Sequence, residues 1–251
     1  SGVVDAEAGV VYWSPTLKDR NVHLLDMIAE AVQVPVFVDN DANLVAMAEM
    51  YFGYGREVKD FLVVTVETGV GMGIVLNGEI YRGTRGRGSE FGHTKVQLDG
   101  ALCRCGQRGC LEAYVSDYAL LREASVNQDF RAGQTPNEQV RGLINAAKAG
   151  DKTAATIIQR AGRMFAMGLA NLVNIFDPEL IILSGERMQS DFWYADEVIS
   201  AIRESSVQVD LPPPEVIIHK WGDQMWAMGA AAYAINGVDR IALHDVGDNA
   251  A

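Results

Sequence analysis

The three cysteines of this chain all lie within the eight residues Cys103-Arg104-Cys105-Gly106-Gln107-Arg108-Gly109-Cys110. Three thiols cannot all pair within one chain, and a reducing compartment disfavours structural disulfides. His93 lies ten positions before Cys103, and one imidazole with three thiolates makes a closed tetrahedral site that suits zinc. Such a site leaves no open position for water, so it predicts a structural zinc ion. A regulatory disulfide with one spare thiol, and a core position for His93, stay open as alternatives.

Composition limits the class of protein. With 251 residues, 49% of them hydrophobic, the chain can build one large domain or two lobes around a real core. A net charge of −12 opposes the phosphate backbone of DNA, so direct DNA binding by this chain is not expected. No apolar run reaches the length of a spanning helix, and no signal peptide is recognisable, so we expect a cytoplasmic protein without a membrane partner. The chain starts directly in a predicted strand, which suggests further sequence upstream.

Helical and strand patterns alternate along the chain and predict an α/β fold. A three-stranded meander with an Asn77-Gly78 turn is expected at about 60–83, and Pro178 is expected to close a mainly helical stretch that starts at Leu111. The other expected elements are strands within 3–13, a helix at 21–33, a buried strand at 34–38, a helix at 41–53, a strand at 178–185, a helix at 196–205, a strand at 214–220 and a small-residue helix near 225–235.

Two carboxylates accompany the predicted zinc ligands. Glu90 and His93 are spaced i, i+3, which places them on one face of a helical turn, and Glu112 follows Cys110 by two positions. If one ring nitrogen of His93 binds zinc, the other can donate to a hydroxyl group of a ligand. Glu90, His93 and Glu112 therefore predict a pocket for a polyhydroxyl ligand.

A second polar cluster, Asp39-Asn40-Asp41, lies between an apolar run and a helical pattern. Any of the three can serve as an N-cap. At the end of a strand, Asn40 could equally bind a pair of hydroxyls, and Asp41 could act as a general base. The glycines at 69–78 are similarly ambiguous, because they suit both a tight hairpin and a backbone cradle for phosphate.

Taken together and in this order, DNDAN, TGVGMGIVLNG, EFGH and CRCGQRGCLE resemble the ROK family of repressors, open reading frames and sugar kinases. The resemblance extends over essentially the whole chain and implies an actin-like, ribonuclease H-like ATPase fold with two lobes, a sugar in the cleft, and a dimer or tetramer. The zinc ligands that it implies are His93, Cys103, Cys105 and Cys110. The sugar contacts that it implies are Asn40, Asp41, Gly69, Glu90, His93 and Glu112. Asp41 matches the catalytic base of the kinases.

The resemblance also divides the chain. Residues 1–39 would be the remainder of an incomplete N-terminal lobe, with a C-terminal helix at about 224–237 packing back on it. Residues 40–223 would form the C-terminal ROK lobe with the sugar pocket and the zinc loop, and 238–251 a tail.

Departures from the kinase pattern separate the two branches of the family. Glu67 replaces the first glycine of a G-T-G phosphate turn, Ser184-Gly185-Glu186 stands where G-G-G is expected, and Ser89 replaces a glycine before Glu90. Neither the D-x-G-G-T phosphate motif of the kinases nor a helix-turn-helix occurs in these residues. We therefore predict the sensing and oligomerisation domain of a transcriptional regulator, and we leave enzymatic activity open. Its ligand would be a sugar or sugar phosphate, and an N-terminal winged helix outside this chain would contact DNA. The alternative is an ATP-dependent hexose kinase that uses Mg-ATP, with Asp41 as its base.

Overall fold

The computed structural model describes residues 2–125, 134–185, 196–207 and 210–248. The chain forms two compact units. Unit 1 comprises Ser1–Val63, Met72–Ser89 and Trp221–Ala251, and unit 2 comprises Val64–Gly71 and Glu90–Lys220. The segment that follows Asp39 belongs to unit 1. The lobes with a boundary between residues 39 and 40 stay a prediction. In the part of the chain that the structure describes, no helix could cross a membrane.

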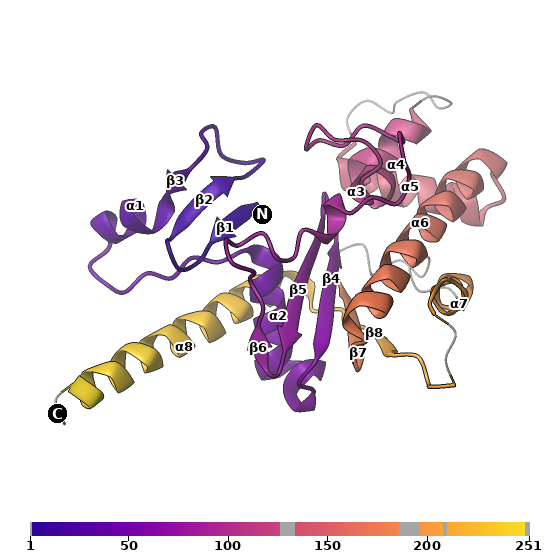
Figure 1. The fold of residues 1–251 in the computed structure, drawn as a ribbon. Helices are drawn as coiled ribbons and strands as arrows, with labels where there is room; N and C mark the ends of the chain where they lie inside the picture. The colour runs from indigo at the N-terminus through magenta and orange to yellow at the C-terminus, as the bar shows by residue number, and fades with distance from the viewer. Residues whose placement is uncertain (1, 126–133, 186–195, 208–209, 249–251) are drawn as a thin grey trace. The chain divides into compact units, whose positions relative to one another are not determined.

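Unit 1 begins with an antiparallel sheet of strand order β1-β2-β3 (Figure 1). Its strands are β1 (Val3–Asp5), β2 (Val10–Trp13) and β3 (Val22–His23), and α1 (Leu24–Ala31) follows directly. The Asp5 carboxylate stabilises the first turn by accepting hydrogen bonds from the Ala8 backbone N–H, at 3.0 Å, and from the Tyr12 hydroxyl, at 3.1 Å. The two strands predicted within 3–13 are confirmed.

The prediction of a strand at 34–38 is wrong. These residues have no regular secondary structure, and Val34 is 65% exposed. The apolar run VPVFV fits a strand locally, but a strand also needs a neighbour to complete its backbone hydrogen bonds. No such neighbour lies alongside it among the described residues.

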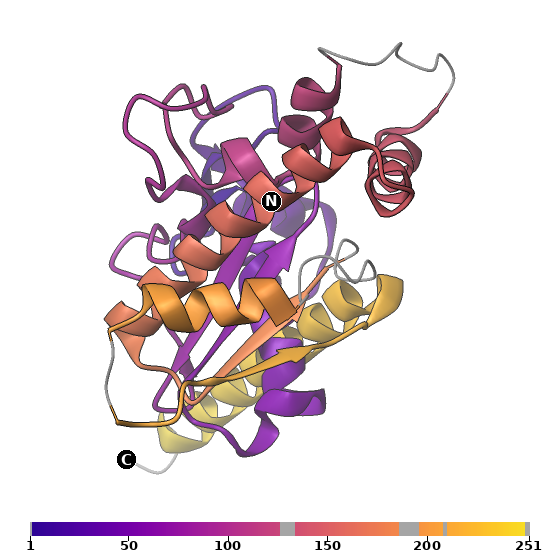
Figure 2. The ribbon, with the colours of Figure 1, turned by 90° about the vertical axis from the view of Figure 1, so that its right-hand side faces the viewer.

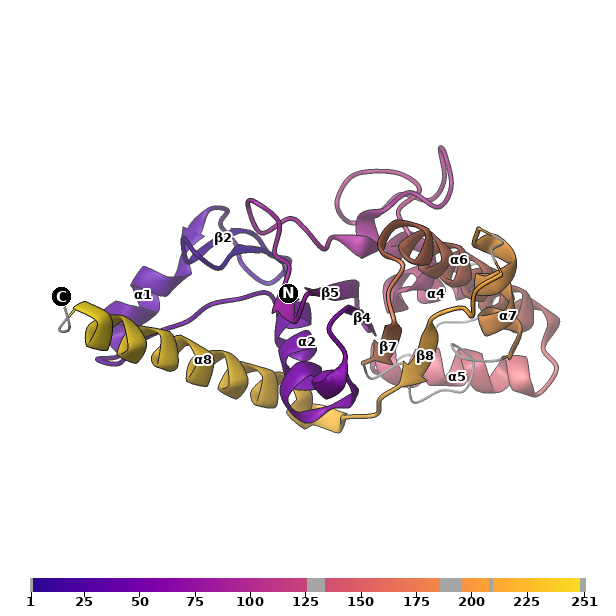
Figure 3. The ribbon, with the colours of Figure 1, turned by 60° about the horizontal axis from the view of Figure 1, so that its bottom comes forward.

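Two helices of unit 1 pack against each other: α2 (Asp41–Phe52) and α8 (Met225–Asp248) (Figure 3). A Cβ atom on Gly229 would overlap the Leu44 carbonyl group, so glycine lets the two backbones approach closely. The predicted last helix was expected to end near Gly237, but α8 continues to Asp248. Gly237 does not cap the helix; a Cβ atom there would overlap the Phe37 ring.

A second sheet has five strands in the order β6-β5-β4-β7-β8. Its strands are β4 (Phe61–Val66), β5 (Val70–Leu76), β6 (Glu79–Ile80), β7 (Leu180–Ser184) and β8 (Glu215–Ile218). The meander is confirmed: Asn77 and Gly78 both have positive φ, 55° and 76°, as the tight turn before β6 requires. Strands β7 and β8 pair in parallel.

Unit 2 is mainly helical, as predicted between Leu111 and Phe176. Its helices are α3 (Glu112–Val115), α4 (Asp117–Ala124), α5 (Pro136–Lys148), α6 (Lys152–Phe176) and α7 (Asp196–Ser205). Figure 2 shows α7 alongside the long helix α6. Helix α6 starts at an Asp151 cap and ends at Asp177, whose φ of 42° is left-handed, directly before Pro178.

The core of unit 2 fixes the two segments that carry the predicted site. Phe91 and Leu111 are both fully buried, and both contact Gly168 in the middle of α6. Phe91 lies between Glu90 and His93 in sequence, and Leu111 lies between Cys110 and Glu112. Burying these two apolar side chains therefore positions the polar residues beside them. The short 3-10 helices are η1 (Tyr54–Glu57) and η5 (Gly222–Gln224) in unit 1, and η2 (Phe91–His93) in unit 2.

Candidate functional site

The cysteine loop, residues 94–110, is a tight backbone structure that brings its three thiols together. The Cys103 N–H donates to the Gln107 carbonyl oxygen at 2.8 Å, and the Gly106 N–H donates to the Cys103 carbonyl oxygen at 3.0 Å. Gly106 and Gly109 have φ values of 87° and 75°, which glycine adopts without strain. A Cβ atom on Gly109 would also overlap the Gln97 carbonyl oxygen. Both glycines therefore allow the tight loop that brings the three thiols together.

The four predicted metal ligands converge. One ligand atom each from His93, Cys103, Cys105 and Cys110 lies within 4.8 Å of all the others. The Cys103 Sγ lies 3.7 Å from the His93 Nδ1, and the Cys105 Sγ lies 3.7 Å from the Cys110 Sγ. Ligands at the usual zinc distance of about 2.3 Å, at the corners of a tetrahedron, are about 3.8 Å apart. The residues thus fit a tetrahedral metal ion in both donor type and spacing.

Charge around the cluster also favours a cation. Burial opposes ionisation of Cys103, but hydrogen bonds from His93 and Tyr118 outweigh it and lower its pKa to about 7. Burial raises the pKa of Cys110 to about 11, and the neighbouring thiols Cys103 and Cys105 add to this, against the hydrogen bond from Lys95. Thiols this close together resist joint ionisation, and a divalent cation supplies the charge that lets them ionise together.

The predicted sugar contacts of unit 2 adjoin this cluster. The His93 Nδ1 faces Cys103, and its other ring nitrogen, Nε2, lies 3.9 Å from the Glu90 Oε2. The hydrogen bond with Cys103 raises the pKa of His93. The Glu112 Oε2 accepts from the Val70 backbone N–H at 3.3 Å, and a Cβ atom on Gly69 would lie 3.0 Å from the same oxygen. Unit 2 therefore groups the carboxylates with the cysteine loop, and it leaves Glu90 and His93 partly exposed, at 35% and 25%.

Asn40 and Asp41 belong to unit 1, at the start of α2. Asn40 is the N-cap: its Oδ1 accepts from the Ala42 N–H at 2.8 Å, and its Nδ2 donates to the Gly2 carbonyl oxygen at 2.5 Å. The Asp41 Oδ1 also accepts from the Ala42 N–H, at 3.1 Å. The capping alternative for Asn40 is thus confirmed, and a cap can still present its amide group to a ligand.

Asp39, the third member of that cluster, has a structural role. Its side chain is fully buried; Oδ2 pairs with the Arg82 guanidinium at 2.6 Å, and Oδ1 accepts from Asn40 and Asn43. Arg82 also lies over the Tyr233 ring, 5.4 Å from its centre. We call Asp39, Asn40, Asn43 and Arg82 the Asp39 cluster. The sequence gives no sign of Arg82, since its pairing with Asp39 spans 43 positions.

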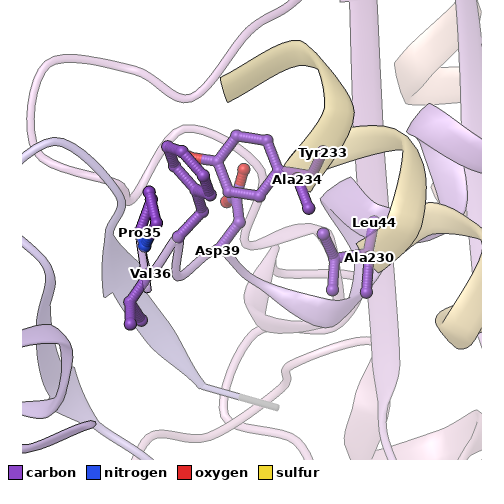
Figure 4. Close-up of a pocket in the computed structure, with 8 residues that line it drawn as sticks. Pro35, Val36, Asp39, Leu44, Ala230, Tyr233 and Ala234 are labelled. Carbon is purple, nitrogen blue, oxygen red and sulfur yellow. The ribbon is translucent and has the colours of Figure 1, made fainter. Parts of the chain in front are cut away.

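A cavity of about 250 Å³ lies in unit 1 next to the Asp39 cluster. Figure 4 shows Asp39 and Tyr233 between the segment that contains Pro35 and Val36 and the helix α8. The lining residues are Pro35, Val36, Phe37, Asp39, Leu44, Ala230, Tyr233 and Ala234. It contains none of the predicted sugar contacts.

Lys95 and Tyr118 contact thiols of the cysteine loop and were not predicted. The Lys95 Nζ donates to the Cys110 Sγ at 2.9 Å. The Tyr118 hydroxyl lies 3.5 Å from the Cys103 Sγ and 3.4 Å from the Glu112 Oε1. Lys95 lies two positions after the predicted ligand His93, and this closeness in sequence could have indicated that it is near the thiols. Tyr118 lies on a separate helix, α4, and no sequence pattern points to it.

The two turns that depart from the kinase pattern meet in unit 2. Gly185 has a φ of 104°, and a Cβ atom on it would lie 2.9 Å from the Val66 carbonyl oxygen and 3.2 Å from the Glu67 Cγ. The ends of β4 and β7 therefore lie together, with the Glu67 side chain beside Gly185. Glu186, the other acidic departure, lies outside the described residues.

Comparison with known proteins covers nearly the whole chain. The model of the ROK family matches residues 1–236. The chain is 29% identical over 242 residues to a xylose repressor of Caldicellulosiruptor bescii, covering 94% of this chain and 61% of that protein. It is 37% identical over 193 residues to a glucokinase of Thermotoga maritima, covering 73% of this chain and 61% of that protein.

Among solved structures, a ROK hexokinase from Thermus thermophilus superposes with a TM-score of 0.81 at 32% identity, covering 95% of this chain and 78% of that one. The chain spans about 60% of the length of the two curated relatives. Repressors and sugar kinases thus both occur among its relatives, and with a family match of this extent the chain belongs to the ROK family.

Proposed function

We propose that this chain is the sugar-sensing and oligomerisation domain of a cytoplasmic transcriptional regulator that controls carbohydrate-metabolism genes. Its fold would be the actin-like fold of two lobes, the first of them incomplete. The sugar or sugar phosphate would be bound by Asn40, Asp41, Gly69, Glu90, His93 and Glu112. DNA would be contacted by an N-terminal winged helix outside this chain, in a homodimer or tetramer. The similarity to the xylose repressor supports this proposal.

The position of Glu67 is the observation that favours a sensor over a kinase. Ligands of α/β folds bind at the carboxyl ends of strands, and the Glu67 side chain lies beside Gly185, directly after the ends of β4 and β7. A carboxylate at ~5 Å from a phosphate, with an effective dielectric of ~20, costs about 3 kcal/mol per pair of unit charges. A polyphosphate carries several such charges, so Glu67 disfavours ATP.

Nucleotide binding tests this choice. Titration of the full-length protein with D-glucose, D-xylose and N-acetylglucosamine should give saturable binding of at least one sugar, whereas magnesium with a non-hydrolysable ATP analogue should not bind. Glu67→Gly should raise the affinity for the analogue by about a hundredfold, and Glu67→Gln should give most of that gain, because only the charge is removed. Tight binding of the ATP analogue to the wild-type protein would contradict the proposal that the chain is a sensor.

The second candidate is an ATP-dependent hexose kinase, favoured by the carboxylate of Asp41 at the start of α2 and by the glucokinase relative. Asp41 would take the proton from the sugar hydroxyl that attacks the γ-phosphate of Mg-ATP. Sugar-dependent ADP production by the full-length protein, abolished by Asp41→Asn, would establish this reaction in place of the sensor.

For the metal we propose one structural zinc ion, held by His93, Cys103, Cys105 and Cys110. Zinc would supply positive charge and a fixed tetrahedral geometry, and no open coordination position. Through its Nδ1, His93 would be held in one ring orientation, so that Nε2 stays directed toward Glu90 and a sugar hydroxyl. The spacing of the ligand atoms supports this proposal.

A further inference from the structure

Tyr118 connects two groups that the proposed function treats separately. Its hydroxyl lies 3.5 Å from the Sγ of Cys103, a proposed metal ligand, and 3.4 Å from the Oε1 of Glu112, a proposed sugar contact. The other carboxylate oxygen of Glu112 accepts from the Val70 N–H at 3.3 Å. The Cys103 thiol also donates to the Glu112 Oε1, at 3.7 Å, but it loses that bond once it gives up its proton to bind a metal ion. The phenol then joins the cysteine loop to the carboxylate, and the carboxylate joins α3 to the start of β5.

The ring of Tyr118 is held by the same loop. The guanidinium carbon of Arg104, which lies between two of the proposed ligands, is 4.0 Å from the centre of the ring. A cation over an aromatic face is attracted by the ring quadrupole, and this contact restricts the ring on the side of the loop. The position of Tyr118 therefore depends on the conformation of residues 103–105, which metal ligation fixes.

We propose that Tyr118 is a positioning residue that couples the metal state of the cysteine loop to the orientation of Glu112. A phenol has one proton to donate, and Cys103 and Glu112 compete for it. A sulfur that shares its electrons with a metal ion is a weaker acceptor, so ligation of Cys103 directs the proton to the Glu112 Oε1. With Oε1 bound by Tyr118 and Oε2 by Val70, the Glu112 carboxylate is fixed.

Coupling of this kind is reciprocal. If the metal orients Glu112 through Tyr118, then a sugar that binds Glu112 also raises the affinity for the metal, and we expect this gain to appear as slower release. This part of the inference rests on the proposed function, whereas the link from Tyr118 to Glu112 and Val70 does not require a sugar.

Tyr114 offers a matched control. It lies four positions before Tyr118, in α3, and also binds the cysteine loop, where its hydroxyl accepts from the Ala101 N–H at 2.7 Å. Its hydroxyl is not bonded to Cys103 or Glu112 among the described residues. Tyr114→Phe and Tyr118→Phe therefore each remove one hydroxyl from the loop, and of the two only Tyr118→Phe removes a hydroxyl that donates to Glu112.

The first experiment measures amide hydrogen exchange at Val70 in the zinc-loaded full-length protein without sugar. Tyr118→Phe should raise the exchange rate at Val70 by about tenfold, because Glu112 is no longer fixed as acceptor, and Tyr114→Phe should leave it within about twofold. Zinc content should stay near one per chain in both variants. Equal exchange rates at Val70 in the two variants would overturn the proposal.

The second experiment measures release of zinc to a chelator, with and without the sugar that the wild type binds. Sugar should slow release from the wild type and from Tyr114→Phe, and it should have no effect on Tyr118→Phe, which should also bind the sugar about tenfold more weakly. Sugar-dependent protection that survives in Tyr118→Phe would overturn the coupling. Failure of all tested sugars to bind the wild type would reject the proposed function instead, and exchange at Val70 would still decide the role of Tyr118.

Discussion

The cysteine loop of unit 2 and the Asp39 cluster of unit 1 both concentrate polar side chains beside the start of a helix. They differ in whether the charges and hydrogen-bonding groups within the region match one another. In the Asp39 cluster the buried carboxylate is met by the Arg82 guanidinium and by amide donors from Asn40 and Asn43. In the cysteine loop, three sulfurs and an imidazole converge, and burial raises the pKa of Cys110 to about 11.

This difference teaches how to separate structural from ligand-binding polar residues. A cluster whose charges and donors are matched by the chain itself stabilises the fold, whereas a cluster of similar donors that repel one another in their ionised form calls for a cation. Four changes test the distinction, and they are given below from the largest expected effect to the smallest.

Cys105→Ser should have the largest effect. Cys105 is exposed, so little packing is lost, and any large effect must come from the metal. We expect zinc content to fall from about one per chain to near zero, and the melting temperature to fall by about 10 °C or more, since several kcal/mol of binding energy is lost. Elemental analysis and thermal unfolding measure both. Gln107→Ser, an exposed neighbour in the same loop, is the control, and equal behaviour of the two variants would exclude a structural metal.

Arg82→Met should break the Asp39 cluster without changing zinc content. The side chain of Asp39 is fully buried and that of Arg82 is 28% exposed, so removing the guanidinium leaves a buried carboxylate without its counter-charge. Loss of one partner of a buried ion pair costs about 3 kcal/mol. Chemical denaturation measures this loss, with the exposed Arg85→Met as control. If Arg82→Met released zinc, the two regions would not be independent.

Zinc affinity should increase with pH. With its pKa raised to about 11, Cys110 is protonated at neutral pH and must lose a proton to bind metal, while Cys103, with a pKa lowered to about 7, is about half ionised at that pH. One released proton corresponds to about a tenfold gain in affinity per pH unit. Competition titrations between pH 6 and pH 8 should show at least this slope, and an affinity that is flat over the range would contradict thiolate ligation.

Substitution of Asn40 should have the smallest effect. It separates the capping role of this residue from its proposed role in sugar binding. Asn40→Ala removes the side-chain cap of α2 and should cost about 1 kcal/mol. Asn40→Asp keeps the capping oxygen of α2, but it replaces the amide donor to the Gly2 carbonyl oxygen by a charge, so it should retain the cap and weaken sugar binding. Unfolding and sugar titration of both variants measure the two roles. Sugar affinity unchanged in Asn40→Asp would remove Asn40 from the proposed contacts.

Local patterns predicted much of the fold. The turn at Asn77-Gly78, the helix that begins after Asn40 and the helix at Asp196–Ser205 follow from turn chemistry, capping and periodicity, which act within a few residues. The run at 34–38 was predicted wrongly, because a strand exists only where another strand pairs with it. The end of α8 was placed too early, since Gly237 serves helix packing against Phe37.

The sequence by itself determined the family, the α/β alternation and the four groups that could bind a metal. Cysteine is rare in this chain, and ligand types and their spacing are chemical properties of the residues. Tertiary structure alone decided the partners that come from distant segments: Arg82 for Asp39, Tyr118 for Glu112 and Cys103, and Gly185 for Glu67. These contacts depend on which buried side chains pack together, and here Phe91 and Leu111 against Gly168 fix the arrangement from which the candidate site of unit 2 is built.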